Sequence, residues 1–522
     1  MGTQNRGFGE ARDIKYLEQE RQELQKRIDN QKSVDERRKF GQFSTPISLA
    51  EEIVSYGLSI QQNTKISFLE PAIGTGAFLS ALLSEIEKTD KNILSASGIE
   101  IDKEFFEAAS LLWKDTKLNL LNTDFTSISP NSKYNFVISN PPYVRHHYIS
   151  QCDKIRLSES VKKETQLEIS GLSGLYCYFV LLAHKWLSPN AICGWLLPSE
   201  FMDVNYGDTL KAYLLDKVHL LRIHRYDPKQ CKFDDALVSS CVVWFKNETV
   251  DNDYEIEFSF GGTHLEPILT KQVRKSILKK ERKWTQFPIY NFHQSSEKKD
   301  CFTLGDFFDI KRGLATGDNA FFILTKEQIH DRDIEMSFFS PILPSPRYLD
   351  VDEVLADEYG YPQISTQYFL LNCTLPENEI KESHPQLWSY LETGSQTTAL
   401  KYLCKSRKEW YLQEKRKTAK FLCSYMGRGG KKNALPFRFI LNHSEAVATN
   451  SYLMLYPKRH LSQIIEANPD IINDVWEALK DISAFDFEKE GRTYGGGLKK
   501  IEPKELEKVQ CQQLSSLYYK FA

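Results

Sequence analysis

The sequence predicts an α/β fold in which a doubly wound, mostly parallel β-sheet is followed by a carboxyl-terminal α+β domain. Four short apolar runs lie within residues 66–143, at spacings that repeated βα units require. A glycine-containing loop follows the first run, and polar residues end the others. The chain has 522 residues, which exceeds the usual range of a single domain. We therefore expect two large domains and an appendage.

The first apolar run, residues 66–79, has the pattern of a strand, a Gly-rich loop and the start of a helix. Its loop contains Glu70, Pro71, Ala72, Gly74 and Gly76. Glycines let the backbone approach a ligand closely. The loop lacks the Gly-Lys-Ser/Thr of a phosphate-binding loop and the third glycine of a dinucleotide fingerprint. A ligand without a phosphate fits this loop better.

The next two runs each end in an acidic residue. Residues 96–102 predict a short strand that ends at Glu100, where a carboxylate can bind ribose hydroxyls. Residues 121–125 end a third unit, in which Asp124 could accept a hydrogen bond from an adenine amine and Phe125 could pack on its ring. Any single acidic residue here could instead be a solvated strand end or a helix cap. The ordered set favours a binding site.

The fourth run, residues 134–139, leads into Asn140, Pro141, Pro142 and Tyr143. The Asn140 side-chain oxygen and the Pro141 carbonyl could each accept a hydrogen bond from an exocyclic amine, which would favour attack by its nitrogen on a sulfonium methyl. Successive prolines make this backbone rigid. Tyr143 could stack on a purine, worth roughly 1–3 kcal/mol. The alternative is an ordinary turn after a strand.

Two further segments complete a motif order. Residues 41–46 look like the cofactor-side motif that precedes the Gly-rich loop, and residues 232–245 look like the segment that carries an aromatic residue facing a flipped base. The chain therefore resembles the S-adenosylmethionine-dependent amino-methyltransferases of DNA, and within them the gamma-class, TaqI-like adenine-N6 enzymes. The motifs span roughly residues 40–245. One departure is Glu70, where many relatives have Asp.

This resemblance implies a Rossmann-like class I methyltransferase domain followed by a target-recognition domain. It implies double-stranded DNA as the partner, S-adenosylmethionine as the cofactor, and an adenine held between Tyr143 and Phe233. The implied catalytic residues are Asn140, Pro141, Pro142, Tyr143 and Phe233. The implied cofactor-binding residues are Thr45, Glu70, Pro71, Ala72, Gly74, Gly76, Glu100, Asp124 and Phe125.

Changes in composition divide the chain into three predicted parts: a helical appendage over 1–39, a catalytic domain over 40–280, and a DNA target-recognition domain over 281–522. Residues 14–39 have a narrow apolar stripe of Leu17, Leu24 and Ile28, which predicts either a helix docked on its own domain or a short dimerising coiled coil. The second domain is placed from about a basic stretch at 271–283 onward.

The predicted second domain contains a strongly basic segment. Residues 401–432 hold eleven Lys or Arg against two Glu, a local balance of +9. The aromatics Tyr402, Trp410, Tyr411, Phe421 and Tyr425 are interleaved. Basic charge with aromatic residues is typical of a nucleic-acid surface, and a solvated charged face is the alternative. The loops 311–319 and 493–500, both glycine-hinged, look like elements of target-recognition domains.

Other features set bounds on location and chemistry. The net charge is −3, so any nucleic-acid surface must be local. Ten cysteines show neither a Cys-x-x-Cys pair nor zinc spacing, which indicates a reduced compartment without structural metal. No run of 18 apolar residues occurs, so we expect a cytoplasmic protein without membrane contact.

We expect His184 to be a packed or surface histidine. We expect residues 145–172 either to cover the site or contact the strand being methylated, or to be a plain surface loop.

The sequence thus predicts a site-specific, adenine-specific DNA methyltransferase, the modification half of a restriction-modification system. A monomer is expected, with a dimer as the alternative. Methylation of an RNA adenine or of a protein glutamine amide stays open, as does a non-catalytic DNA-binding module. A fused nuclease needs more than the 39 residues before Phe40, so we expect a separately encoded endonuclease partner.

Overall fold

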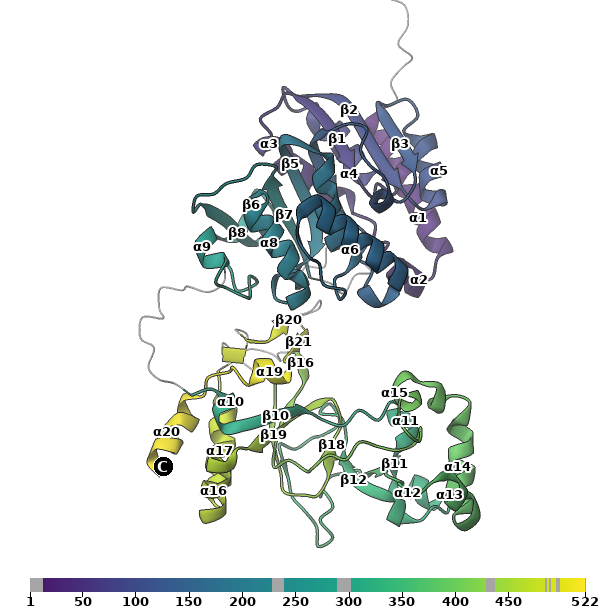
Figure 1. The fold of residues 1–522 in the computed structure, drawn as a ribbon, viewed down its shortest axis with the longest axis vertical. Helices are drawn as coiled ribbons and strands as arrows, with labels where there is room; N and C mark the ends of the chain where they lie inside the picture. Colours follow the sequence, from purple (N-terminus) through teal and green to yellow (C-terminus); the bar gives the residue numbers. More distant parts are fainter. Residues whose placement is uncertain are drawn as a thin grey trace, which may run out of the picture. The chain divides into compact units, whose positions relative to one another are not determined.

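The computed structural model describes residues 13–227, 239–288, 302–428, 437–483, 486–487, 490–493 and 498–521. The chain folds as two compact units, Met1–Gln294 and Ser295–Ala522. Figure 1 labels their helices and strands. Among the described residues, no helix combines the length and the apolar character that crossing a bilayer requires.

The described residues of the first unit form a nine-stranded sheet in the order β3-β2-β1-β4-β5-β7-β6-β8-β9. The strands are β1 (Lys65–Glu70), β2 (Asn92–Glu100), β3 (Leu118–Asn122), β4 (Tyr134–Ser139), β5 (Leu187–Pro198), β6 (His219–Arg225), β7 (Ser240–Lys246), β8 (Glu255–Gly262) and β9 (Pro267–Arg274). Strands β1 to β5 pair in parallel, and β7 and β9 pair antiparallel to their neighbours. The predicted mostly parallel α/β fold is confirmed.

The strand order reverses between β1 and β4, which pair in parallel through Phe68 with Phe136 and Leu69 with Val137. Open α/β sheets bind ligands outside the carboxyl ends of the strands at such a reversal. Because β1 to β4 run in the same direction, the polar residues that end them lie along one edge of the sheet. The topology therefore gathers the predicted site residues.

Helices cover both faces of this sheet. The helices of the first unit are α1 (Ile14–Gln31), α2 (Val34–Phe40), α3 (Ile47–Ile60), α4 (Ala77–Ile86), α5 (Lys103–Leu112), α6 (Gln151–Thr165), α7 (Leu175–Ala183), α8 (Asp208–Asp216) and α9 (Lys275–Leu278). One apolar core joins the sheet to α1, α3, α4 and α5, and another joins it to α6, α7 and α8. Strand β4 feeds both cores, since Phe136 and Ile138 pack in one and Val137 in the other.

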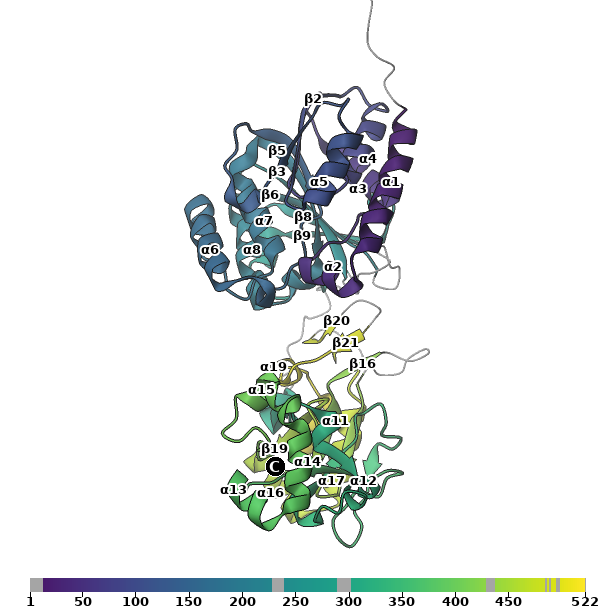
Figure 2. The same cartoon turned by 90° about the vertical axis from the view of Figure 1, so that its right-hand side faces the viewer.

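The amino-terminal segment folds as two helices, α1 and α2, rather than the single predicted one. The break is at Lys32, whose backbone is extended. Helix α1 lies along α4 and α5 (Figure 2) and buries Leu17 and Ile28 against its own unit. The docked-helix interpretation is confirmed, because the apolar stripe that a coiled coil would need is already used.

Residues 151–165 form helix α6, so the interpretation of 145–172 as a plain loop is wrong. The Ser150 hydroxyl caps this helix by accepting a hydrogen bond from the Asp153 amide at 3.1 Å. Only Leu157, Val161 and Thr165 are buried along α6. The buried apolar residues were therefore too few for the sequence pattern to predict a helix. In the folded chain, the Ser150 cap and the two buried aliphatic residues stabilise it.

The basic stretch 271–283 lies within the first unit, contrary to its predicted place at the domain boundary. Residues 271–274 are in β9 and 275–278 in α9. Beyond them, Trp284 is buried and its amide donates to the Met202 carbonyl at 3.1 Å. The predicted boundary at residue 280 thus lies before the division that the structure makes after Gln294. Strands β8 and β9, which extend the sheet, were not predicted from the sequence.

The second unit is an α+β structure whose described residues form sheets of five strands (β10-β19-β15-β17-β13), four (β11-β14-β12-β18) and three (β16-β21-β20). Its strands are β10 (Phe308–Arg312), β11 (Ile323–Thr325), β12 (Phe339–Leu343), β13 (Glu353–Val354), β14 (Tyr368–Leu371), β15 (Phe421–Ser424), β16 (Met426–Arg428), β17 (Phe439–Asn442), β18 (Val447–Ala448), β19 (Tyr452–Pro457), β20 (Arg492–Thr493) and β21 (Leu498–Lys500). Its helices are α10 (Leu304–Phe307), α11 (Asn319–Phe322), α12 (Lys326–His330), α13 (Glu377–Ser383), α14 (Pro385–Ser395), α15 (Tyr402–Lys405), α16 (Arg459–Ala467), α17 (Ile471–Lys480), α19 (Pro503–Leu506) and α20 (Gln512–Phe521).

Candidate active site

The Gly-rich loop between β1 and α4 has a conformation that depends on glycine. Gly74 and Gly76 both have positive φ, at 57° and 91°. A Cβ on Gly76 would lie 2.5 Å from Nε1 of Trp113, which donates to the Thr75 carbonyl at 2.8 Å. The loop therefore wraps tightly over Trp113 while its backbone stays open to a ligand.

Glu70 ends β1 inside the unit, with 2 % of its surface exposed. Burial raises the pKa of this carboxyl well above its ordinary value, against the opposing charge of Arg21. Its Oε2 atom is buried and has no hydrogen-bond partner among the described residues. A buried, unpaired carboxylate oxygen is costly, so this position suits a cationic ligand group.

Glu100 ends β2, and its carboxylate is bound by backbone. Its Oε2 accepts from the Gly74 amide and its Oε1 from the Asp102 amide, both at 2.8 Å. Burial raises the pKa of Glu100. Each oxygen keeps a further lone pair that a hydroxyl could use. Glu100 thus links the Gly-rich loop to the second strand end.

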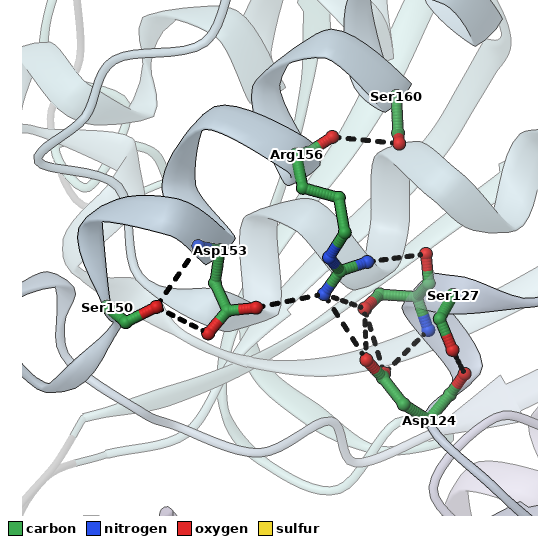
Figure 3. Close-up of polar contacts among 7 residues, drawn as sticks. Asp124, Ser127, Ser150, Asp153, Arg156 and Ser160 are labelled. Atoms are coloured by element: carbon green, nitrogen blue, oxygen red, sulfur yellow. Dashed lines mark hydrogen bonds and ion pairs between the residues drawn. The ribbon is translucent and has the colours of Figure 1, made fainter.

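Asp124 lies just after β3 and is held by several polar contacts (Figure 3). It accepts from the amide and hydroxyl of Thr126 at 2.8 Å, and Nη2 of Arg156 on α6 lies 3.3 Å from its Oδ2. The adjacent Phe125 is buried, with its ring 5.2 Å from that of Phe179. Asp124 is therefore at the sheet edge as predicted, whereas most of the Phe125 ring is used by the core.

Asn140 is oriented by the segment that precedes α3. Its Nδ2 donates to the Phe43 carbonyl at 3.0 Å and to the Thr45 hydroxyl at 3.2 Å. Both donors of the carboxamide are thereby used, and its Oδ1 is buried without a hydrogen-bond partner among the described residues. The predicted cofactor-side motif and the predicted catalytic motif thus meet, and they leave one acceptor unsatisfied.

Tyr143 is more enclosed than a free stacking platform would be. The residue is 8 % exposed, its hydroxyl donates to the Leu196 carbonyl at 3.1 Å, and its ring centroid lies 5.8 Å from that of Phe43. Gly41 also contacts this segment, because its carbonyl accepts from the Tyr143 amide at 3.2 Å. Gly41 has a φ of 64°, and a Cβ there would lie 2.4 Å from that amide nitrogen.

The remaining residues predicted for the first unit differ in burial, and one of them lies outside the described residues. Pro141 and Pro71 are buried, and Pro142 and Ala72 are half-buried beside the residues already described. Phe233 lies outside the described residues. His184 packs as expected, with Nδ1 3.0 Å from the Tyr213 hydroxyl.

One polar group escaped the sequence analysis. One potential ligand atom from each of Glu52, His224 and His264 lies within 4.8 Å of the others. Among the described residues, this is the cluster of side chains that could hold a metal ion. His264 Nδ1 is 3.0 Å from Glu52 Oε1, and the Tyr226 hydroxyl lies 3.2 Å from the same nitrogen. Wide sequence separation hid this cluster.

In the second unit, the aromatics interleaved with basic residues at 401–428 mostly serve the core. Tyr411, Phe421 and Tyr425 are buried, whereas Tyr402 is 86 % exposed. Tyr425 packs under two basic side chains, with Arg312 at 4.0 Å and Lys500 at 5.0 Å from its ring centroid. One basic residue from each of the two predicted segments, Arg312 in β10 and Lys500 in β21, thus lies over Tyr425, and residues 429–436 and 494–497 lie outside the described residues.

The residues of the first unit fit S-adenosylmethionine. Gly74 and Gly76 hold the loop in positive-φ conformations with open space beside Gly74, Glu70 offers an unpaired acceptor for an ammonium, and Glu100 has lone pairs for ribose hydroxyls. Together with the strand order, this donor set defines a class I S-adenosylmethionine-dependent methyltransferase.

Comparisons with known proteins specify the kind of methyltransferase. Residues 54–231 match the family "Eco57I restriction-modification methylase", and residues 281–520 match "Type II methyltransferase M.Eco57I, C-terminal domain". The chain is 26 % identical over 500 residues to Type II methyltransferase M.AccI of Acinetobacter calcoaceticus, covering 93 % of this chain and 87 % of that one. It is 24 % identical over 493 residues to Type II methyltransferase M.XamI of Xanthomonas campestris pv. amaranthicola, covering 92 % and 86 %.

A solved structure agrees with this at the level of fold. The Type IIL restriction-modification enzyme MmeI in complex with DNA superposes with a TM-score of 0.52 at 12 % identity, covering 85 % of this chain and 68 % of MmeI. The chain is a DNA methyltransferase of the restriction-modification type, and its two matched segments are similar to the Eco57I methylase family and to the M.Eco57I carboxyl-terminal domain.

Proposed function

We propose that this methyltransferase is adenine-specific, of the gamma class, and methylates the N6 amine of an adenine flipped out of duplex DNA. The observation that carries the proposal is the buried, unpartnered Oδ1 of Asn140, whose amide nitrogen is fixed by Phe43 and Thr45. Fixing the nitrogen leaves the oxygen as an acceptor for a substrate amine. The exocyclic amine of adenine is a planar donor of the required kind.

In the proposed reaction, the amine donates one hydrogen bond to Asn140 Oδ1 and one to the Pro141 carbonyl. Both acceptors stabilise the positive charge that develops on nitrogen, in a site where they are already oriented. Bound S-adenosylmethionine supplies a methyl group on a sulfonium sulfur. The amine nitrogen, held by these two acceptors, would take that methyl group in line as its bond to sulfur breaks, S-adenosylhomocysteine would leave, and the extra proton would pass from the strongly acidic nitrogen to solvent.

No covalent enzyme intermediate is needed in this reaction. Among the described residues, Cys193, Cys241 and Cys177 are buried, and burial raises the pKa of the Cys177 and Cys241 thiols to about 12. Such thiols are poor nucleophiles near neutral pH. This supports amine methylation over the cytosine-C5 reaction, which requires a cysteine nucleophile.

The adenine would stack between Tyr143 and Phe233 after leaving the duplex. Extrusion costs a few kcal/mol, which stacking and the two hydrogen bonds offset. Glu70, Glu100 and Asp124, with the loop residues Pro71, Ala72, Gly74 and Gly76, would bind the cofactor, together with Thr45 and Phe125. We further propose that the second domain, over 281–522, reads the DNA target, and that a separately encoded endonuclease recognises the same target.

The test is to incubate the purified chain with labelled S-adenosylmethionine and mixed-sequence duplex DNA, and then to identify the labelled nucleoside. The expected product is N6-methyldeoxyadenosine. Label in N4-methyldeoxycytidine would keep the amine chemistry and overturn the choice of base. Label in RNA or on a protein glutamine, with none in DNA, would overturn the proposed substrate.

A further inference from the structure

Helix α1 forms one wall of a cavity beside the predicted cofactor-side motif. The cavity has a volume of about 560 Å³, within the range of about 300–1,000 Å³ that is usual for small-molecule sites. Its lining combines α1 residues such as Arg21 and Gln25 with residues 43–48. The amino-terminal helix is therefore part of the surroundings of the site and not only an appendage.

Arg21 stands out among these lining residues because it is 3 % exposed and only partly satisfied. Its Nε and Nη2 donate to the Glu18 carboxylate, both at 2.7 Å, and its Nη1 donates to the Thr75 hydroxyl at 3.1 Å. A guanidinium has five N–H donors. Among the described residues, these contacts use three of the five donors. One N–H group on Nη1 and one on Nη2 are left without a partner.

The hydroxyl that Arg21 contacts belongs to the Gly-rich loop. Thr75 also donates from that hydroxyl to Gln25 Oε1 at 2.8 Å, so two α1 side chains hold the loop. The Arg21 charge reaches the buried Glu70 carboxylate and favours its ionised form. The Arg21 guanidinium and the Glu70 carboxylate thus both adjoin the Gly-rich loop. Among the described residues, the guanidinium keeps N–H donors without a partner, and Glu70 Oε2 is an acceptor without a partner.

This pair of charges matches a zwitterionic amino acid. The methionyl end of S-adenosylmethionine carries an ammonium and a carboxylate on one carbon. If Glu70 takes the ammonium, the carboxylate needs a nearby group with paired donors, and a guanidinium matches carboxylate geometry better than an ammonium does. Among the described residues that line the cavity, Arg21 and Arg37 carry a guanidinium, and of these Arg21 is buried whereas Arg37 is half-buried.

We propose that Arg21 of α1 binds the α-carboxylate of the cofactor's methionyl group. The inference rests on S-adenosylmethionine as the cofactor and on the proposed role of the Gly-rich loop. It makes the amino-terminal helix a component of the cofactor site, with Glu18 holding the guanidinium in place and Thr75 joining it to the loop.

The experiment compares two ligands that differ only in the carboxylate, S-adenosylmethionine and its decarboxylated form, by calorimetry on the full chain. The wild-type protein should bind S-adenosylmethionine about tenfold to a hundredfold more tightly, as expected for charge-assisted hydrogen bonds. Arg21→Gln should reduce this ratio to about 1. Arg21→Lys should give an intermediate ratio, because it keeps the charge and loses the paired donors.

The matched control is Arg27→Gln, which makes the same change at an exposed α1 position outside the cavity lining. It should keep the wild-type ratio. A merely structural role of Arg21 would weaken both ligands equally, so an unchanged ratio in Arg21→Gln overturns the inference while the cofactor assignment stands. If the wild-type protein binds neither ligand, the cofactor site itself has been misassigned and the inference falls with it.

Discussion

The proposed catalytic edge of the first unit and the basic surface of the second unit are built in different ways. At the catalytic edge, Glu70, Glu100, Asp124 and Asn140 follow consecutive strands, and parallel pairing places them side by side. Around Tyr425, by contrast, Arg312 comes from near the beginning of the second unit's sequence and Lys500 from near its end. The first arrangement follows from repeated local units, whereas the second depends on how distant loops pack.

This difference predicts how each region responds to substitution. Positions at the catalytic edge are fixed by strands and by several hydrogen bonds each, so single changes there should have large and specific effects on cofactor binding or transfer. Contacts on the basic surface are dispersed, so single changes there should weaken DNA binding only slightly.

The largest effect is expected for Asn140→Ala. Removing Oδ1 deletes one preorganised acceptor for the amine, so methyl transfer should fall about 10²–10³-fold while cofactor affinity is kept. Single-turnover transfer and calorimetry measure the two quantities. Asn119→Ala, at an exposed position of β3, is the control and should behave as wild type. Full activity in Asn140→Ala would exclude the proposed mechanism.

Gly76→Ala should come next. The added Cβ would meet Trp113 at 2.5 Å, and the residue would have to keep a φ of 91°, at a cost of about 1–3 kcal/mol in stability. Thermal or urea unfolding measures this cost. Gly171→Ala is the matched control, because a Cβ there meets nothing within 4 Å. Equal stability of the two variants would show that the loop is not constrained as described.

Glu100→Ala should raise the cofactor dissociation constant about tenfold, or about 1.4 kcal/mol, because it removes the ribose acceptor and the hydrogen bond to the Gly74 amide. Calorimetric titration of S-adenosylhomocysteine tests this. An unchanged affinity would remove Glu100 from the site. Glu100→Gln keeps one acceptor oxygen and should fall between the two.

The pH dependence of cofactor binding should reveal Glu70. Burial raises the pKa of its carboxyl in the free protein, whereas a bound ammonium favours the ionised form and lowers that pKa. Binding should therefore release protons, and affinity should fall as the pH decreases through the raised pKa. Calorimetry in buffers of different ionisation enthalpy measures this release, which Glu70→Gln should reduce. Proton uptake on binding would contradict the assignment.

The smallest effect is expected for Arg312→Ala in the second unit. Loss of one basic side chain over Tyr425 should weaken DNA binding a few-fold and reduce the salt slope by about 1, with cofactor affinity unchanged. Fluorescence anisotropy over a range of salt concentrations measures both. Arg332→Ala, which removes an Arg packed over Tyr390, is the matched control. The same salt slope in both variants would place the DNA surface elsewhere.

The sequence by itself determined the fold class and the positions at the strand ends that form the proposed catalytic edge. Strand ends such as Glu70 and Asn140 are local features, because an apolar run predicts a strand and parallel pairing then fixes which of its ends meets the others. The narrow apolar stripe of the amino-terminal segment predicted a helix but left a docked helix and a coiled coil open, and the packing of α1 on its own unit decided between them.

Only the tertiary structure decided which groups those residues contact. The fixed amide of Asn140, the Arg156 contact with Asp124 and the place of Arg21 beside the Gly-rich loop join segments far apart in the sequence. The burial of Tyr411 and Tyr425 likewise arises from packing, since an aromatic side chain among lysines can face either solvent or core. Hydrogen-bond partners and burial are properties of the assembled chain, and no local pattern encodes them.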